Sequence, residues 1–169
     1  MGGLRLPLVQ QLGVRVVHWP RYSERGFTLM EVLLAMALLA LLGAIAVPAY
    51  RGYVDRVNES RAIADIGGLQ IDLYRWELGT GGLPLTLAAA GLDGLRDPWG
   101  RPYVYLNMAT AGKNDSRKDK NLHPLNTDFD LYSLGRDGDS KLPLTAKASR
   151  DDILRANNGA FIGRAEDYN

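Results

Sequence analysis

The apolar stretch over residues 27–50, FTLMEVLLAMALLALLGAIAVPAY, constrains this 169-residue chain more than any other part of it. Glu31 is the only residue in the stretch that carries a charge at neutral pH. A helix needs about 20 apolar residues to cross the hydrocarbon core of a bilayer, which is about 30 Å thick. The stretch therefore predicts one membrane-spanning helix.

The segment before this stretch is basic, since it carries four arginines and a single acid, Glu24. A basic flank stays on the cytoplasmic side, so we expect the rest of the chain to be exported. An ordinary secretory signal has a shorter apolar core that ends in a small-residue cleavage site. Here the apolar run continues to Pro48 without such a site. We therefore expect the helix to stay in the mature protein.

Glu31 is the residue in the stretch that most needs an explanation. A carboxylate within lipid is costly unless a partner satisfies it, which makes it a functional hypothesis by default. The residues alone leave two interpretations open. Glu31 either lies near the headgroups without a role, or it pairs with a group that another part of the system supplies.

The segment RGFTLMEVLLAMALLALLGAIAVP resembles the type III signal of type IV pilins and of the pseudopilins of type II secretion. The resemblance implies that a prepilin peptidase removes a leader, residues 1–26, by cleaving between Gly26 and Phe27, and then methylates the amino group of Phe27. Glu31 would pair with the Phe27 ammonium of an adjacent subunit in a filament. Pro48 falls where the family carries a helix-weakening proline.

Residues 51–78 predict an amphipathic helix that continues the membrane segment. Its apolar residues recur at spacings of three and four, which places them on one face for a core. These residues are Ala62, Ile66, Leu69, Leu73 and Trp76.

Residues 79–169 predict a small β-rich head. The sequence Asp97-Pro98-Trp99-Gly100 indicates a turn. Tyr103–Leu106 and Phe129–Leu134 then predict two strands of an antiparallel sheet. We favour Trp99 as a core side chain beneath the turn over a ligand contact.

The polar segment from Met108 to Thr127 separates these two strands. Its basic side chains are Lys113, Arg117, Lys118, Lys120 and His123. A basic surface for a partner is one interpretation. A solvated, mobile loop is the interpretation that we favour.

The stretches SRAIADIGGLQIDLYRWELGTGGLP, DPWGRPYVYLN and FDLYSLGRDG are similar to the head of the type II secretion major pseudopilin, the general secretion pathway protein G family. With the N-terminal segment, the resemblance covers most of residues 25–140. It implies an α+β, type IV pilin-like fold, in which a long N-terminal helix packs on a small antiparallel sheet. The expected parts are the leader, the assembly helix over 27–50, the stalk helix over 51–78 and the periplasmic head over 79–169, which ends in an acidic loop.

Two acidic clusters, LGRDGDS and SRDD, lie within the last 40 residues or so. Calcium binds six to eight oxygens, which such loops can supply, although two solvated acidic turns are the alternative. The resemblance implies one structural calcium, with the Asp137 and Asp151 side chains and the Leu134 carbonyl as ligands and Asp152 as a substitute. The chain has no cysteine, so a metal would replace the disulfide that stabilises many small exported domains.

The charge balance of 20 basic and 19 acidic residues gives no reason to expect nucleic acid as a partner. Neither histidine lies in a pattern that suggests a partnered base, so we expect no enzyme.

The resemblance implies a subunit that polymerises from the bacterial inner membrane into a periplasmic pseudopilus and drives export of folded proteins. Its expected partners are further copies of itself, minor pseudopilins, the inner-membrane secretion platform and the prepilin peptidase. A type IV pilus pilin for adhesion, motility or DNA uptake is the alternative, and a signal-anchored protein that never assembles is a third possibility.

Overall fold

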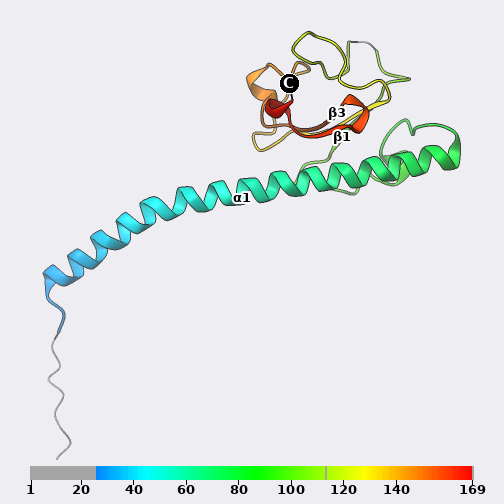
Figure 1. The fold of residues 1–169 in the computed structure, drawn as a ribbon. Helices are drawn as coiled ribbons and strands as arrows, with labels where there is room; N and C mark the ends of the chain where they lie inside the picture. The colour runs from blue at the N-terminus through cyan, green and yellow to red at the C-terminus, as the bar shows by residue number, and fades with distance from the viewer. Residues whose placement is uncertain (1–25, 113, 169) are drawn as a thin grey trace, which may run out of the picture. The chain divides into compact units, whose positions relative to one another are not determined.

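The computed structural model describes residues 26–112 and 114–168 (Figure 1). The predicted leader lies outside the described residues except for Gly26, and so does Lys113 of the polar segment. The described chain divides into two structural units, one up to Leu42 and one from Gly43 on. A single helix, α1 (Leu29–Thr80), contributes to both.

The first unit contains the N-terminal part of α1, whose faces are all apolar apart from Glu31. All side chains over residues 26–42 are exposed in the isolated chain, including Leu29 and Leu39. By length and composition this part of the helix can cross a membrane. So large an exposed apolar surface is unstable in water, so it needs lipid or other apolar helices around it.

In the second unit α1 becomes amphipathic, as predicted. Ala62, Ile66, Leu69 and Leu73 are buried at the expected spacing, whereas Trp76 is only half-buried. The helix ends where Gly81 takes a positive φ of 82° and donates its N–H to the Glu77 carbonyl at 2.8 Å. Glycine adopts this left-handed conformation without steric cost, which is why it ends helices.

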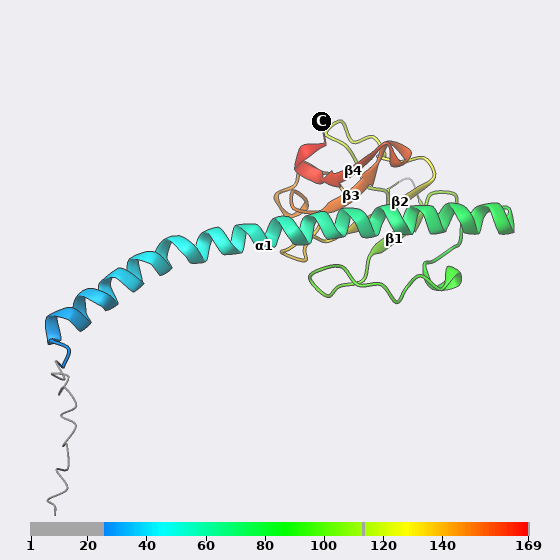
Figure 2. The same ribbon diagram turned by 60° about the horizontal axis from the view of Figure 1, so that its bottom comes forward.

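The head is built on a four-stranded antiparallel sheet in which the strands neighbour each other in chain order (Figure 2). Its strands are β1 (Val104–Asn107), β2 (Phe129–Ser133), β3 (Ile153–Ala156) and β4 (Phe161–Arg164). Val104 lies opposite Tyr132, so the two predicted strands are confirmed as partners. Strands β3 and β4 were not predicted.

Short 3₁₀ helices complete the head. They are η1 (Ala88–Ala90), η2 (Lys147–Ser149), η3 (Asn157–Gly159) and η4 (Ala165–Asp167). The last two flank β4 and bring the end of the described chain back against the sheet.

Alternation along the strands gives the sheet two apolar faces. Phe129, Leu131 and Ile153 point toward the buried face of α1 and form the main core with it. The next residue of β3, Leu154, lies in a second cluster on the opposite face, because successive strand side chains point to opposite sides. This second cluster also contains Leu125 and Leu144, which come from outside the strands.

The segment from Met108 to Thr127 is not the solvated loop that we favoured. Arg117 is 2% exposed and Leu125 is 6% exposed. The Lys118 N–H donates to the Leu142 carbonyl at 2.9 Å, and the Leu144 N–H donates to the Lys118 carbonyl at 3.0 Å. The prediction was wrong because polar side chains that bond within the fold look the same in a sequence as solvated ones. The segment is therefore partly exposed, near Ala109, near Asp115 and around His123, and partly buried, at Ser116, Arg117, Leu125 and Asn126.

Candidate functional site

The start of α1 holds the residues predicted for processing and assembly. Gly26 and Phe27 precede the helix without regular structure, and the Phe27 side chain is exposed. The Thr28 N–H and hydroxyl both donate to Glu31 Oε2, at 2.9 and 2.8 Å, and the Glu31 N–H donates to Thr28 Oγ1 at 3.2 Å. This reciprocal pattern is a capping box, which satisfies N–H groups that have no partner within the helix.

The capping box gives Glu31 a role within its own chain that sequence reasoning missed, although the signal Thr-x-x-Glu stands at 28–31. The positive end of the helix dipole also favours a carboxylate at this position. Pro48 lies within α1 and removes the N–H that would bond to the Ala44 carbonyl. Cleavage after Gly26, methylation of Phe27 and pairing of Glu31 with another subunit stay predictions.

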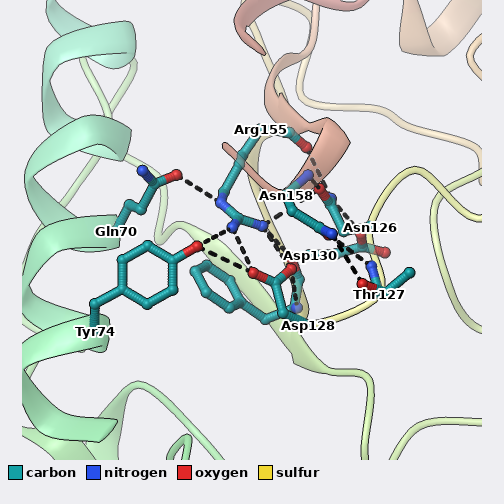
Figure 3. A network of polar contacts seen from close by, with 9 residues as sticks. Gln70, Tyr74, Asn126, Thr127, Asp128, Asp130, Arg155 and Asn158 are labelled. Atoms are coloured by element: carbon teal, nitrogen blue, oxygen red, sulfur yellow. Dashed lines mark hydrogen bonds and ion pairs between the residues drawn. The ribbon is translucent and has the colours of Figure 1, made fainter. Parts of the chain in front are cut away.

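A buried arginine joins α1 to the sheet. Arg155 of β3 is 1% exposed, and its guanidinium donates to five side-chain or backbone groups (Figure 3). These acceptors are Gln70 Oε1 at 2.6 Å, the Tyr74 hydroxyl at 2.6 Å, the Asp128 carboxylate at 2.8 and 2.5 Å, Asn126 Oδ1 at 3.3 Å and the Phe129 carbonyl at 3.0 Å. The guanidinium also lies 4.0 Å from the centre of the Phe129 ring.

This network fixes the rotation and height of α1 against the sheet, because Gln70 and Tyr74 stand one helical turn apart on it. Burial raises the pKa of the Asp128 carboxyl, but the hydrogen bonds from Arg155 and from the Phe129 N–H outweigh burial, so the pKa lies below its ordinary value. Asp128 is therefore an anion at neutral pH and pairs fully with Arg155.

The two turns that carry the head resemblance lie against each other. Asp97 is buried, and its Oδ1 accepts from the Trp99 and Arg101 N–H groups at 3.1 and 2.8 Å. Its Oδ2 accepts from the Ser133 hydroxyl at 2.6 Å, and Ser133 Oγ accepts from the Gly135 N–H at 3.2 Å. Trp99 is half-buried and packs against the main core.

The residues predicted for calcium are brought to one turn, with one exception. Asp151 Oδ2 accepts from the Arg136 and Asp137 N–H groups at 2.9 and 3.0 Å. Asp137 Oδ1 accepts from the Asp139 N–H at 2.9 Å, and the Leu134 carbonyl accepts from the Gly138 N–H at 3.2 Å. In this turn, two successive backbone N–H groups therefore bind the carboxylate of Asp151.

Asp152 is the exception, because its fully buried carboxylate pairs with Arg117 instead. Arg117 Nη2 lies 2.7 Å from Asp152 Oδ2, which also accepts from the Ser140 hydroxyl at 2.6 Å. Burial raises the pKa of Asp152 to about 6, against the lowering effects of Arg117 and Ser140. The other carboxylate oxygen of Asp152, Oδ1, is buried and has no hydrogen-bond partner among the described residues.

This donor set does not fit a calcium ion. Calcium needs six to eight oxygens that converge on it, whereas the Leu134 carbonyl, Asp137 Oδ1 and Asp151 Oδ2 each accept a hydrogen bond from a backbone N–H. Over residues 26–112 and 114–168, no group of three or more histidine, cysteine, aspartate or glutamate side chains could hold a metal. The calcium site stays a prediction from the resemblance that this geometry does not support.

Comparison with known proteins finds one matching family model and several relatives of similar sequence. Residues 21–47 match the prokaryotic N-terminal methylation motif. The type II secretion system core protein G of Pseudomonas aeruginosa is 29% identical over 141 residues, 70% of this chain and 87% of that protein. The core protein G of Aeromonas hydrophila is 26% identical over 140 residues, 69% of this chain and 86% of that protein.

A pilus protein is also among the relatives. The fimbrial protein of Neisseria meningitidis is 27% identical over 144 residues, 80% of this chain and 81% of that protein. No solved structure matches the chain significantly. The aligned lengths exceed the length of the methylation motif several-fold, so the similarity to these relatives is not confined to the motif.

Proposed function

Because this chain is a type IV pilin-like protein related to the major pseudopilins of type II secretion, we propose that it polymerises into a periplasmic pseudopilus that drives export of folded proteins. The observation that carries this proposal is the apolar N-terminal part of α1, which lies within the matched methylation motif and has every side chain over 26–42 exposed in the single chain. A helix of this kind is stable in the membrane before assembly and in a bundle of like helices after it.

Glu31 sets the register of the bundle. In the single chain its Oε2 binds Thr28, and in the filament its carboxylate pairs with the methylated ammonium of Phe27 on an adjacent subunit. A pair of this kind inside a dry bundle specifies an arrangement more than it adds net stability. Loss of one partner leaves the other charge buried alone, at a cost of about 3–5 kcal/mol.

The remaining features of the family follow from this arrangement. The basic segment before Phe27 keeps the N-terminus in the cytoplasm, where the prepilin peptidase cleaves after Gly26, and the head lies in the periplasm. The partners are other copies of the chain, minor pseudopilins and the inner-membrane secretion platform. The role is structural rather than catalytic, in agreement with the names of the relatives.

A type IV pilus subunit is the second candidate, and the similarity to a fimbrial protein is the observation that favours it. The two candidates predict different phenotypes in the host. Deletion of the gene stops secretion of folded exoproteins if the chain is a pseudopilin, whereas it stops twitching, adhesion or DNA uptake if the chain forms a pilus.

Assembly itself is tested by disulfide crosslinking, which is clean because the chain has no cysteine of its own. Leu34→Cys and Leu38→Cys variants are co-expressed, because these positions lie two turns beyond Phe27 and Glu31 on the same face of the helix and keep their offset of four residues. We expect dimers across the pair after oxidation in membranes, and none from Leu85→Cys, an exposed head position. A chain that stays monomeric under all of these conditions contradicts polymerisation.

A further inference from the structure

The side chain of Arg117 occupies a buried site made of oxygens. Its Nη1 donates to Ser140 Oγ and to the Lys141 carbonyl at 2.9 Å, and its Nη2 lies 2.7 Å from the Asp152 carboxylate. The face of the guanidinium lies 4.6 Å from the centre of the Tyr132 ring. A hydroxyl, a carbonyl and a carboxylate are the oxygen types that a bound calcium would also use.

A second guanidinium holds the other end of the same loop. Arg101 Nη1 donates to the Gly135 carbonyl at 2.5 Å, and its Nη2 donates to the Arg136 carbonyl at 3.1 Å. A Cβ at Gly138 would lie 2.5 Å from Arg101 Cζ, so the glycine leaves the space that this guanidinium fills. The two arginines therefore bind the loop over residues 134–141 at its two ends.

We propose that Arg101 and Arg117 take the place of a calcium ion in this head. Two guanidinium groups of the chain itself bind the C-terminal loop in place of a metal. The polar segment from Met108 to Thr127 supplies one of them, that of Arg117. This inference goes beyond the proposed function and does not depend on it, since it concerns the folding of the head.

The electrostatics of the loop favour the arginines over a metal. Arg117 already balances Asp152, and Asp151 is held by the Arg136 and Asp137 N–H groups. A divalent cation at this turn would face those N–H dipoles and two nearby guanidinium groups, which repel it. In both places a guanidinium binds oxygens through two separate nitrogens held in one rigid plane, a geometry that the single nitrogen of a lysine does not offer.

The first test compares the mature full-length protein in detergent with millimolar calcium and with a chelator. Thermal unfolding is followed by near-UV circular dichroism, which reports the aromatic residues of the head. We expect the two Tm values to agree within about 1 °C. A Tm that rises by about 5 °C or more with calcium, and that loses this rise in Asp151→Asn, overturns the proposal.

The second test removes the guanidinium group of Arg117. Arg117→Met keeps most of the side-chain volume but leaves Asp152 buried without its partner, so we expect Tm to fall by about 10 °C with and without calcium. Arg75→Met is the matched control, because the Arg75 guanidinium is mostly exposed and pairs with Asp72 on its own helix. An unchanged Tm in Arg117→Met overturns the proposal.

A further variant keeps the test informative if Arg117→Met does not fold. Arg117→Met combined with Asp152→Leu removes both charges, and we expect it to recover most of the lost Tm, because an apolar pair can replace a buried ion pair. Failure of the double variant to exceed the single one overturns the assignment of Asp152 as the partner.

Discussion

Arg155 of β3 holds Asp128 in a two-pronged ion pair, with Nη1 2.8 Å from Oδ1 and Nη2 2.5 Å from Oδ2. The arginine is fully enclosed, while the aspartate side chain is 23% exposed. The same guanidinium reaches Tyr74 on α1, so the pair connects the helix to the sheet. The head can therefore tolerate little change at Arg155.

Replacement of Arg155 by methionine should destabilise the protein by about 3–5 kcal/mol, because it leaves Asp128 and several polar groups without a partner inside the fold. Urea unfolding of the detergent-solubilised chain measures this loss. Arg75→Met serves as the control and should leave the unfolding midpoint unchanged, since exposed pairs contribute little. If Arg155→Met lost no more free energy of unfolding than Arg75→Met, the network around Arg155 would not be what holds α1 against the sheet.

The Asp128 carboxyl predicts how stability depends on pH. Its pKa is below the ordinary value in the folded protein, so its contribution is complete above the unfolded pKa of about 4 and is lost as the pH falls through the folded pKa. We expect the free energy of unfolding to decrease below about pH 4. Asp128→Asn should be less stable at pH 7 and should show a smaller decrease in acid. Equal pH slopes for both proteins would argue against this assignment.

Two substitutions separate the two roles of Glu31. Glu31→Gln keeps a side chain that can complete the capping box but removes the charge, and Thr28→Ala removes the cap but keeps the charge. We expect Glu31→Gln to abolish filaments in an assembly assay and Thr28→Ala to weaken them only slightly. The reverse ranking would show that capping, rather than charge pairing, is what assembly requires.

A substitution at Gly138 tests whether the loop can move away from the Arg101 guanidinium. Alanine at this position is strained twice, by the positive φ of 76° and by the overlap with the Arg101 guanidinium. We expect Gly138→Ala to lose about 1–3 kcal/mol in the free energy of unfolding. Gly82→Ala is the control, because the space around Gly82 is open and its φ is not positive. Equal stability of the two variants would show that the loop adjusts freely.

The local patterns in the sequence predicted much of this fold. The buried face of α1 follows from apolar residues such as Ile66 and Leu73, whose spacing is set by the helix itself. Strands β1 and β2 follow from runs of β-branched and aromatic residues next to turn signals. Strands β3 and β4 were missed because each has four residues and includes an arginine, which resembles loop composition.

The polar interior could not be predicted in the same way. Arg117 and Arg155 are charged residues in polar or short segments, and their partners lie far away in the chain. Nothing local distinguishes a buried arginine from a solvated one, because burial depends on which carboxylate the fold brings beside it. The capping box at Thr28 was different, since its signal was visible in the sequence and was overlooked.

The central claim is that the chain is processed to begin at Phe27 and then assembles through this end. Mass spectrometry of the intact protein from isolated filaments tests it most directly. The account predicts one mature species that starts at N-methylated Phe27, present in the filament fraction. A filament-associated or membrane protein that still begins at Met1, with an unmodified amino terminus, would contradict it.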